Sequence, residues 1–157
     1  MIGDTTTKSG GEFWLGIDVG SVSLKLVLLG ADGEIVFEKY VRLQGQPLPV
    51  AHRELRALLV ARPGLALAGA GVTGSGGAVL ARLLGAPAIN EIVALARGCV
   101  SLSPSVRTLI DIGGEDSKLL LFRSGPEDRA PDLDDFAMNS ICAAGTGSFL
   151  DQQAARL

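Results

Sequence analysis

Two stretches of the chain carry the same chemically active residues at the same spacing. The first has Ile-Asp-Val-Gly at residues 17–20 followed by Lys25, and the second has Ile-Asp-Ile-Gly at residues 110–113 followed by Lys118. The two aspartates are 93 residues apart, and so are the two lysines. A carboxylate at the end of a buried strand, beside the N–H groups of a glycine turn, suits the binding of a phosphate and its metal ion. The repeat therefore indicates two phosphate-binding turns.

The first copy predicts a strand, a turn and a second strand with one polar face. Because side chains alternate along a strand, Ser21, Ser23 and Lys25 share that face. Gly20 lets the backbone come close to an anion, the hydroxyls donate hydrogen bonds, and the lysine adds a compact positive charge. A hairpin with a solvated Ser and Lys face is the alternative interpretation.

The second copy is more acidic than the first. Asp18 and Asp111 together could hold Mg²⁺ through water, because Mg²⁺ keeps most of its hydration shell and usually takes one or two carboxylates. Asp111 or Asp116 could also position the water that attacks the terminal phosphorus. The alternative is an ordinary glycine-rich hairpin, which the match in spacing disfavours. The other residues expected at the phosphate in this turn are Gly113, Gly114 and Lys118.

A third feature is the run Asn-Ser-Ile-Cys-Ala-Ala-Gly-Thr-Gly at residues 139–147, which leads into a predicted helix. The free N–H groups of a helix N-terminus favour a thiolate or a phosphate, so Cys142 is either a metal ligand or a buried small residue. Cys99 lies on the apolar face of a helix predicted from Glu91 to Leu102, with Asn90 as its cap, and is expected in the core.

Two further segments resemble functional elements only in part. Gly71 to Gly77 is rich in glycine but lacks the lysine of a P-loop, so it is interpreted as a tight turn from strand to helix that lines the binding cleft. The sole histidine, His52, has no acid or nucleophile near it in sequence and is predicted to lie at the surface.

Composition excludes several classes of protein. With 47% apolar, 20% charged and 4% aromatic residues in 157, the chain fits one globular domain. The net charge of −3 and the absence of a basic cluster argue against nucleic-acid binding. No apolar stretch reaches the roughly 18 residues of a membrane helix. Residues 1–12 are predicted to be a flexible leader, and a cytoplasmic location is expected.

The order of apolar runs predicts a mixed α/β fold. Three consecutive antiparallel strands are followed by alternating helix and strand, which is the ribonuclease-H-like layout of one mixed five-stranded sheet with flanking helices. Both Asp-Gly turns are then expected to open at the same edge of that sheet. The predicted strands are Phe13 to Asp18, Val22 to Leu29, Glu34 to Leu43, Leu65 to Gly69, Pro87 to Ile89, Arg107 to Ile112, Ser117 to Phe122 and Asp134 to Asn139.

The motifs resemble one family. Residues 16–21 with Lys25, residues 111–116, and the run from 139 to 150 are similar to the ATPase activators of 2-hydroxyacyl-CoA dehydratases and to the ATPase subunits of benzoyl-CoA reductase. These proteins belong to the superfamily of actin-like, sugar-kinase and chaperone ATPases. The resemblance extends from about Trp14 to the end of the chain, and its most specific part is the run that contains Cys142.

This resemblance implies an ATP-dependent electron donor. Such an activator is a homodimer with one four-iron four-sulfur cluster between its subunits; it uses ATP with Mg²⁺ to drive an electron onto a CoA-ester dehydratase or reductase. Cys142 stands where the family has its first cluster ligand. Residues 13–157 would be the N-terminal lobe, truncated before the second cluster cysteine and the adenosine-binding Gly-Gly motif, so this piece alone is expected to be inactive. Glu115 replaces the glutamine of some relatives.

Two other functions fit the same residues. In a phosphotransferase of the sugar-kinase type, an aspartate would deprotonate a substrate hydroxyl. In a non-catalytic module, the ATPase fold would serve interaction within a larger polypeptide. ATP consumption that depends on a sugar would indicate the first, and absence of nucleotide binding would indicate the second.

Overall fold

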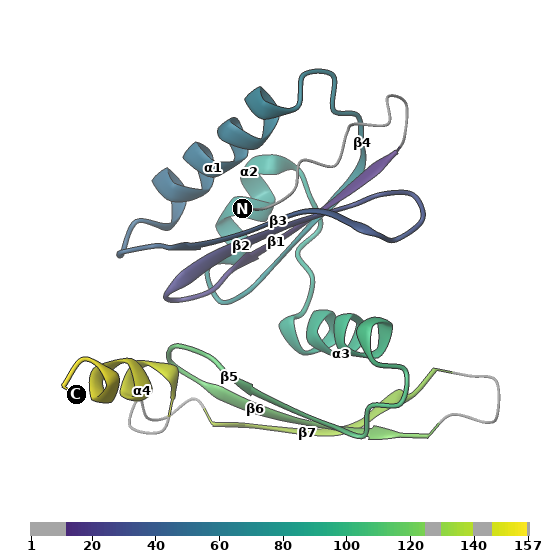
Figure 1. Cartoon of the computed structure of the whole chain (residues 1–157), viewed down its shortest axis with the longest axis vertical. Coiled ribbons are helices and arrows are strands. Elements are labelled where there is room, and N and C mark those ends of the chain that lie inside the picture. The colour runs from purple at the N-terminus through teal and green to yellow at the C-terminus, as the bar shows by residue number, and fades with distance from the viewer. Residues whose placement is uncertain (1–11, 125–129, 140–145, 157) are drawn as a thin grey trace. The chain divides into compact units, whose positions relative to one another are not determined.

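The computed structural model describes residues 12–124, 130–139 and 146–156. The predicted leader, except Glu12, and Cys142 lie outside these residues. The chain divides between Ile89 and Asn90 into two compact units, called here the first and second unit. Each unit has its own sheet (Figure 1). In chain order the elements are β1 (Phe13–Val19), β2 (Ser23–Leu29), β3 (Ile35–Arg42), α1 (Pro47–Ala61), β4 (Leu67–Thr73), α2 (Gly77–Leu84), α3 (Glu91–Leu102), β5 (Thr108–Ile112), β6 (Ser117–Arg123), β7 (Asp132–Asn139) and α4 (Gly147–Ala154).

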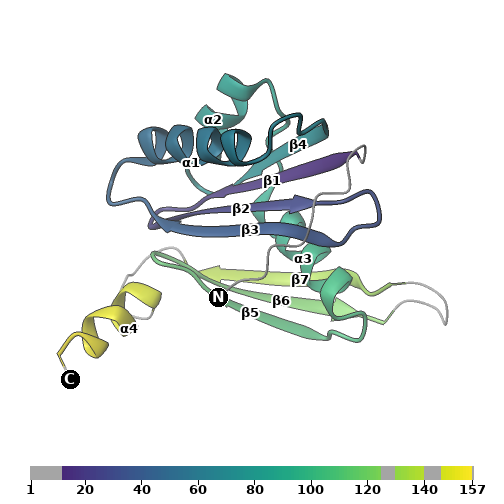
Figure 2. The same cartoon turned by 45° about the horizontal axis from the view of Figure 1, so that its top comes forward.

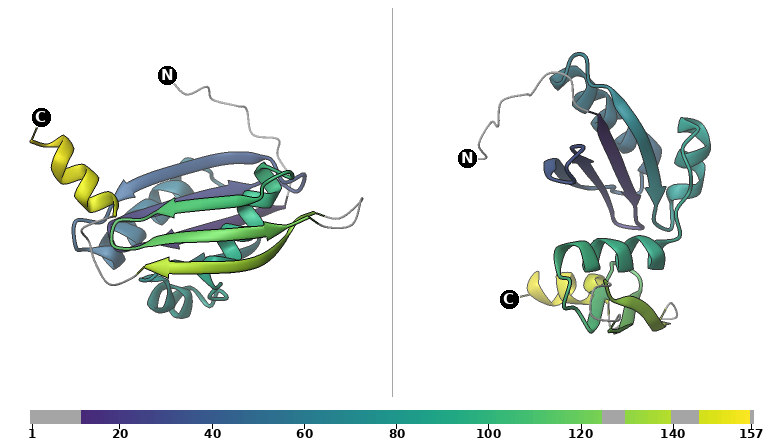
Figure 3. Two further views of the ribbon diagram at one scale, coloured as in Figure 1. Left: turned by 90° about the horizontal axis from the view of Figure 1, so that it is seen from below. Right: turned by 90° about the vertical axis from the view of Figure 1, so that its right-hand side faces the viewer.

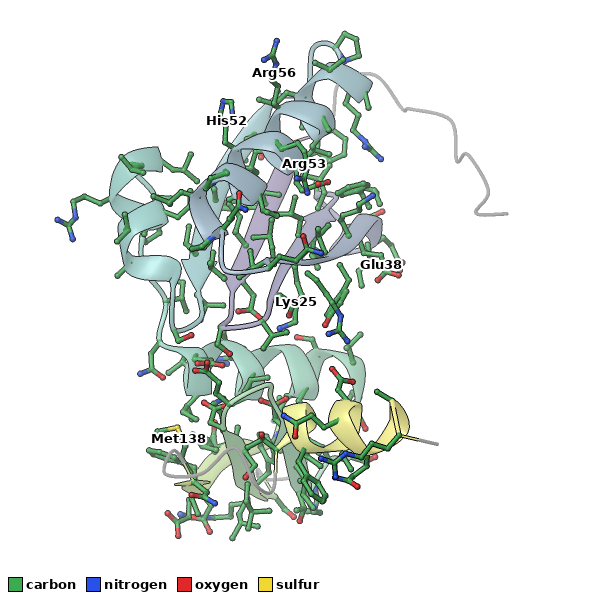
Figure 4. The ribbon with its side chains drawn as sticks, turned by 90° about the vertical axis from the view of Figure 1, so that its left-hand side faces the viewer. Lys25, Glu38, His52, Arg53, Arg56 and Met138 are labelled. Atoms are coloured by element: carbon green, nitrogen blue, oxygen red, sulfur yellow. The ribbon has the colours of Figure 1, made fainter. Side chains whose placement is uncertain are left out.

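The first unit is a four-stranded sheet in the order β3-β2-β1-β4. The strands β1, β2 and β3 pair antiparallel, and β4 pairs with β1 in parallel. Both α1 and α2 lie over the same face of this sheet (Figure 2). Alternation along β2 sends Leu24, Leu26 and Leu28 into the core beneath these helices, where each is at most 1% exposed. Lys25 therefore lies on the face away from α1 (Figure 4).

The second unit has a three-stranded antiparallel sheet in the order β5-β6-β7. Its core consists of Ile92, Ala96, Leu120 and Phe122, so α3 packs against one face of the sheet. Asn90 begins α3 as predicted: its side-chain oxygen accepts hydrogen bonds from the N–H groups of Ile92 and Val93, at 2.9 and 3.2 Å.

The prediction of a single five-stranded sheet is wrong. The fifth position in the first unit holds only an isolated parallel bridge between Val72 and Ala88. The segment from Pro87 to Ile89 is too short for a strand, because Gly85 at φ +63° ends α2 and Asn90 already caps α3. The two Asp-Gly turns accordingly belong to different sheets, and not to one edge of a common sheet.

Candidate functional site

The first turn brings Asp18 and Lys25 together. They are direct partners in the antiparallel pairing of β1 with β2, and Lys25 Nζ donates a hydrogen bond to Asp18 Oδ2 at 2.7 Å. The side chains are 45% exposed for the lysine and 27% for the aspartate, so solvent and a ligand can reach the pair. Ser21 is exposed and Ser23 is buried. The N–H of Gly20 donates to the Ser23 carbonyl at 2.9 Å and closes the turn.

The second carboxylate oxygen of Asp18 has no partner among the described residues. Asp18 Oδ1 is buried and accepts no hydrogen bond from that part of the chain. A buried charged acceptor without a partner is costly, and it is a place where a donor, a water or a cation would be stabilised. This oxygen fits the role of a magnesium or water ligand that the sequence suggests for Asp18.

The backbone of Gly74 lies close to this Asp18 oxygen. Its backbone has φ +89°, and a Cβ placed on it would lie 2.4 Å from Asp18 Oδ1 and 2.5 Å from the Val19 carbonyl oxygen. The N–H of Gly76 donates to that same carbonyl at 2.8 Å. The sequence predicted a turn from Gly71, but β4 continues to Thr73, beside Asp18 in register. Gly74 is therefore part of the site, and glycine is required there because both the φ angle and the close contact exclude a side chain.

The second turn repeats the pairing in a different environment. Asp111 on β5 faces Lys118 on β6 in register, but the lysine is buried, with 2% of its side chain exposed. Its Nζ lies 2.8 Å from both oxygens of Asp116, 3.1 Å from Glu91 Oε1 and 3.5 Å from Asp111 Oδ2. One ammonium group thus joins three carboxylates, which we call the Lys118 cluster.

The charges of the Lys118 cluster raise the pKa of the lysine above its ordinary value of 10.5. Burial by itself lowers the pKa of Lys118, but the hydrogen bonds and charges of Asp116 and Glu91 outweigh it. The three carboxylates keep between 29% and 34% of their side-chain surface exposed. The cluster therefore offers acidic oxygens to a ligand while its cation is enclosed.

Glu91 was not recognised as a site residue from the sequence. It lies in the first turn of α3, where an acidic residue is ordinarily explained by the helix dipole. It is also 27 residues before Lys118 in the chain, so no local pattern connects the two. The contact depends on how α3 packs on the sheet.

The second turn also holds the start of α4. The N–H of Gly147 donates to the Gly113 carbonyl at 2.8 Å, and the Thr146 hydroxyl donates to the Gly114 carbonyl at 3.0 Å. Thr146 is fully buried. A Cβ on Gly113 would lie 2.6 Å from Asp116 Oδ1, so the turn is close-packed from both sides. Thr146 and Gly147, at the start of α4, are thereby attached to the predicted phosphate turn.

Other candidate residues have structural positions. Cys99 is half-buried and packs against the core of the second unit, as predicted. His52 is exposed on α1, as predicted, beside an apolar groove between α1 and α2 (Figure 4). Across the described ranges, no three His, Cys, Asp or Glu side chains are grouped so as to hold a metal ion. Within those same ranges, none of the helices has the length and apolar character needed to cross a bilayer.

The fold and the paired acidic turns define a class of protein. The mixed α/β architecture matches the N-terminal half of actin-like ATPases. The chain belongs to the BadF/BadG/BcrA/BcrD ATPase family, which it matches over residues 15–157.

Three relatives show how far the similarity extends. The activator of lactoyl-CoA dehydratase from Anaerotignum propionicum is 37% identical over 144 residues, covering 90% of this chain and 52% of that protein. Component A of the (R)-2-hydroxyglutaryl-CoA dehydratase of Acidaminococcus fermentans has a TM-score of 0.77 at 32% identity, covering 92% and 53%. The activator of 2-hydroxyisocaproyl-CoA dehydratase from Clostridium difficile, solved with ADPNP bound, has a TM-score of 0.73 at 35% identity, covering 91% and 51%. The chain spans about half the length of these relatives.

Proposed function

We propose that this chain is the phosphate-binding half of an ATP-hydrolysing activator that drives an electron at low potential onto a CoA-ester dehydratase or reductase. The family and its named relatives support this assignment. The observation that carries the nucleotide role is the unpartnered Oδ1 of Asp18 beside the accessible ion pair with Lys25.

The first turn would bind the phosphates directly. Lys25 supplies the positive charge and Ser21 supplies a donor at the turn. Gly20 lets the backbone approach the phosphate, while its N–H closes the turn on the Ser23 carbonyl. Asp18 would hold Mg²⁺ through water, since Mg²⁺ retains most of its water ligands in protein sites. Mg²⁺ would neutralise the charge that builds up on the transferred phosphoryl group.

The second turn would act on the terminal phosphate. Asp111 and Asp116 are the candidates to position the attacking water, with Asp111 also a candidate for the water shell of Mg²⁺, and Gly113 and Gly114 would approach the phosphate by their backbone. The sequence suggested Lys118 as a direct phosphate ligand, but its ammonium is enclosed by three carboxylates. We assign it the role of positioning Asp111 and Asp116 for the reaction.

Nucleotide binding by this chain tests the assignment. Titration calorimetry with Mg·ADPNP should give saturable binding that Lys25→Ala weakens at least tenfold, because a charged phosphate contact is lost. Lys39→Ala is the matched control, since Lys39 is an exposed lysine on β3 of the same unit. Equal binding by all three proteins, or none by any, would contradict the nucleotide role. ATP turnover that requires a sugar would favour a phosphotransferase.

The electron-transfer role rests on Cys142, which we propose as a ligand of a four-iron four-sulfur cluster shared by two subunits. The cluster would supply one-electron chemistry. After anaerobic reconstitution of the activator with iron and sulfide, the broad visible absorption should be lost in Cys142→Ser and retained in Cys99→Ser. Cys99 is the matched control because it packs in the core of the second unit. Unchanged absorption in Cys142→Ser would remove the ligand assignment.

A further inference from the structure

Lys118 is buried because it lies on the face of β6 that α3 covers. Side chains alternate along β6, so Lys118 shares its face with Leu120 and Phe122, which form the core of the second unit together with residues of α3. α3 lies against this face of the sheet (Figure 3, right). Glu91, in the first turn of α3, is therefore placed beside the buried ammonium group, at 3.1 Å.

The ammonium group of Lys118 has three N–H donors, and two residues engage all of them. Both carboxylate oxygens of Asp116 lie 2.8 Å from Nζ and accept hydrogen bonds. Glu91 Oε1, at 3.1 Å, is within hydrogen-bond distance for the third donor. Asp111 Oδ2, at 3.5 Å, is farther than the ~3.2 Å to which such bonds ordinarily extend. Lys118 therefore attracts Asp111 by its charge without donating a hydrogen bond to it.

Asp111 is the carboxylate of the Lys118 cluster whose oxygens stay available. In the described part of the chain its side chain accepts no hydrogen bond, and 33% of that side chain is exposed. Asp116, in contrast, has both oxygens bonded to the ammonium group, and its Oδ1 also lies against Gly113, where an added Cβ would be 2.6 Å away. Of the two acids assigned to the terminal phosphate, Asp111 is thus the one that can still take up water.

We propose that Glu91 is a positioning residue: it accepts the third N–H of Lys118 and thereby keeps Asp111 free to bind the water shell of Mg²⁺. This inference rests on the proposed nucleotide role and deepens it by separating the two acids. Asp111 holds the water, and Asp116 anchors Lys118. Without Glu91 the third N–H turns to Asp111, the next acceptor at 3.5 Å, and a carboxylate already bonded to an ammonium group holds metal-bound water less well.

The hydrogen-bond step is tested without nucleotide. Crystal structures of the chain and of Glu91→Ala compare the distance between Lys118 Nζ and Asp111 Oδ2. Loss of the Glu91 acceptor should shorten this distance from 3.5 Å to about 2.8 Å, the ordinary length of an ammonium–carboxylate hydrogen bond. In Glu91→Gln the amide oxygen still accepts the third N–H, so the distance should not change. An unchanged distance in Glu91→Ala would overturn the proposal.

The effect on the ligand is measured as the Mg²⁺ requirement of nucleotide binding. In calorimetric titrations with ADPNP, the Mg²⁺ concentration for half-maximal binding should rise about tenfold in Glu91→Ala, the scale expected when the support of a metal ligand is lost. It should stay close to the parent value in Glu91→Gln, and binding of ADPNP without Mg²⁺ should be the same in all three proteins. Glu34→Ala is the control for loss of charge, because Glu34 is exposed in the loop between β2 and β3.

Two further results would overturn the proposal. Equal loss of Mg²⁺ dependence in Glu91→Ala and Glu91→Gln would show that Glu91 acts by its charge and not as an acceptor. An unchanged Mg²⁺ requirement in both variants, with normal binding by the parent chain, would show that Asp111 does not depend on Glu91. Glu91→Asp, which withdraws the acceptor by one methylene and keeps the charge, replaces Glu91→Ala if that variant does not fold.

Failure of the proposed function has a different signature. The parent chain would then bind no ADPNP with or without Mg²⁺, whereas the crystal structures would still decide whether Glu91 holds Lys118 away from Asp111.

Discussion

Lys25 and Lys118 occupy the same register position in two copies of one motif, yet their surroundings are opposite. The first contacts one carboxylate and is 45% exposed; the second contacts three and is 2% exposed. The pattern Asp, Gly turn, Lys thus supports two electrostatic arrangements. In the first a cation is available to a ligand, and in the second a cation organises acids.

The two lysines should differ in their effect on stability. Lys118→Met leaves three neighbouring carboxylates without their shared cation and should lower the free energy of unfolding by about 3 kcal/mol. Lys25→Met removes an exposed ion pair and should cost about 0.5 kcal/mol. Urea denaturation at neutral pH measures both. Equal small losses would show that the Lys118 cluster contributes no structural energy.

The raised pKa of Lys118 predicts the pH dependence of this contribution. Because the folded pKa lies above 10.5, the stabilisation is fully present below pH 10.5 and is lost as the pH rises through the folded value. The difference in unfolding free energy between the parent chain and Lys118→Met should therefore be constant from pH 7 to about 9.5 and shrink above 10.5. A difference that grew with alkaline pH would be inconsistent with a stabilised ammonium.

Gly74→Ala should damage the first turn. The added methyl would meet Asp18 Oδ1 at 2.4 Å in a backbone with φ +89°, and we expect a loss of about 2 kcal/mol or more together with weaker Mg·ADPNP binding. Gly85→Ala is the matched control: Gly85 has φ +63° but nothing within 4 Å of the added Cβ. The difference between the two variants in thermal unfolding isolates the contact with Asp18.

Thr146→Val should loosen the start of α4. The substitution keeps the volume of a fully buried side chain but removes its hydrogen bond to the Gly114 carbonyl, which should cost about 1 kcal/mol. Hydrogen exchange should then quicken across residues 147–154. Ser101→Ala, which removes an exposed hydroxyl bonded to the Arg97 carbonyl within α3, is the control and should leave α4 unchanged.

The local parts of the site could be predicted from the sequence, because they depend on short spacings. The repeat and the alternation of side chains predicted a strand, a turn and a second strand at both Asp-Gly motifs, and Asn90 was predicted as the cap of α3. The single sheet was wrong because alternation identifies strands without identifying which edges pair. Glu91 was missed as a site residue, and the contact of Gly74 with Asp18 was not predicted although its segment was expected to line the cleft. Packing, and not sequence proximity, brings these residues to Lys118 and Asp18.

The start of α4 is hydrogen-bonded directly to the second turn. Gly113 and Gly114 accept hydrogen bonds from Gly147 and Thr146, two consecutive residues at the root of the helix. A displacement of those two carbonyls would move the first residues of α4 directly, because the hydrogen bonds join the turn to the helix without an intervening loop. The two glycines that are proposed to approach the phosphate by their backbone are consequently the same two whose carbonyls anchor α4.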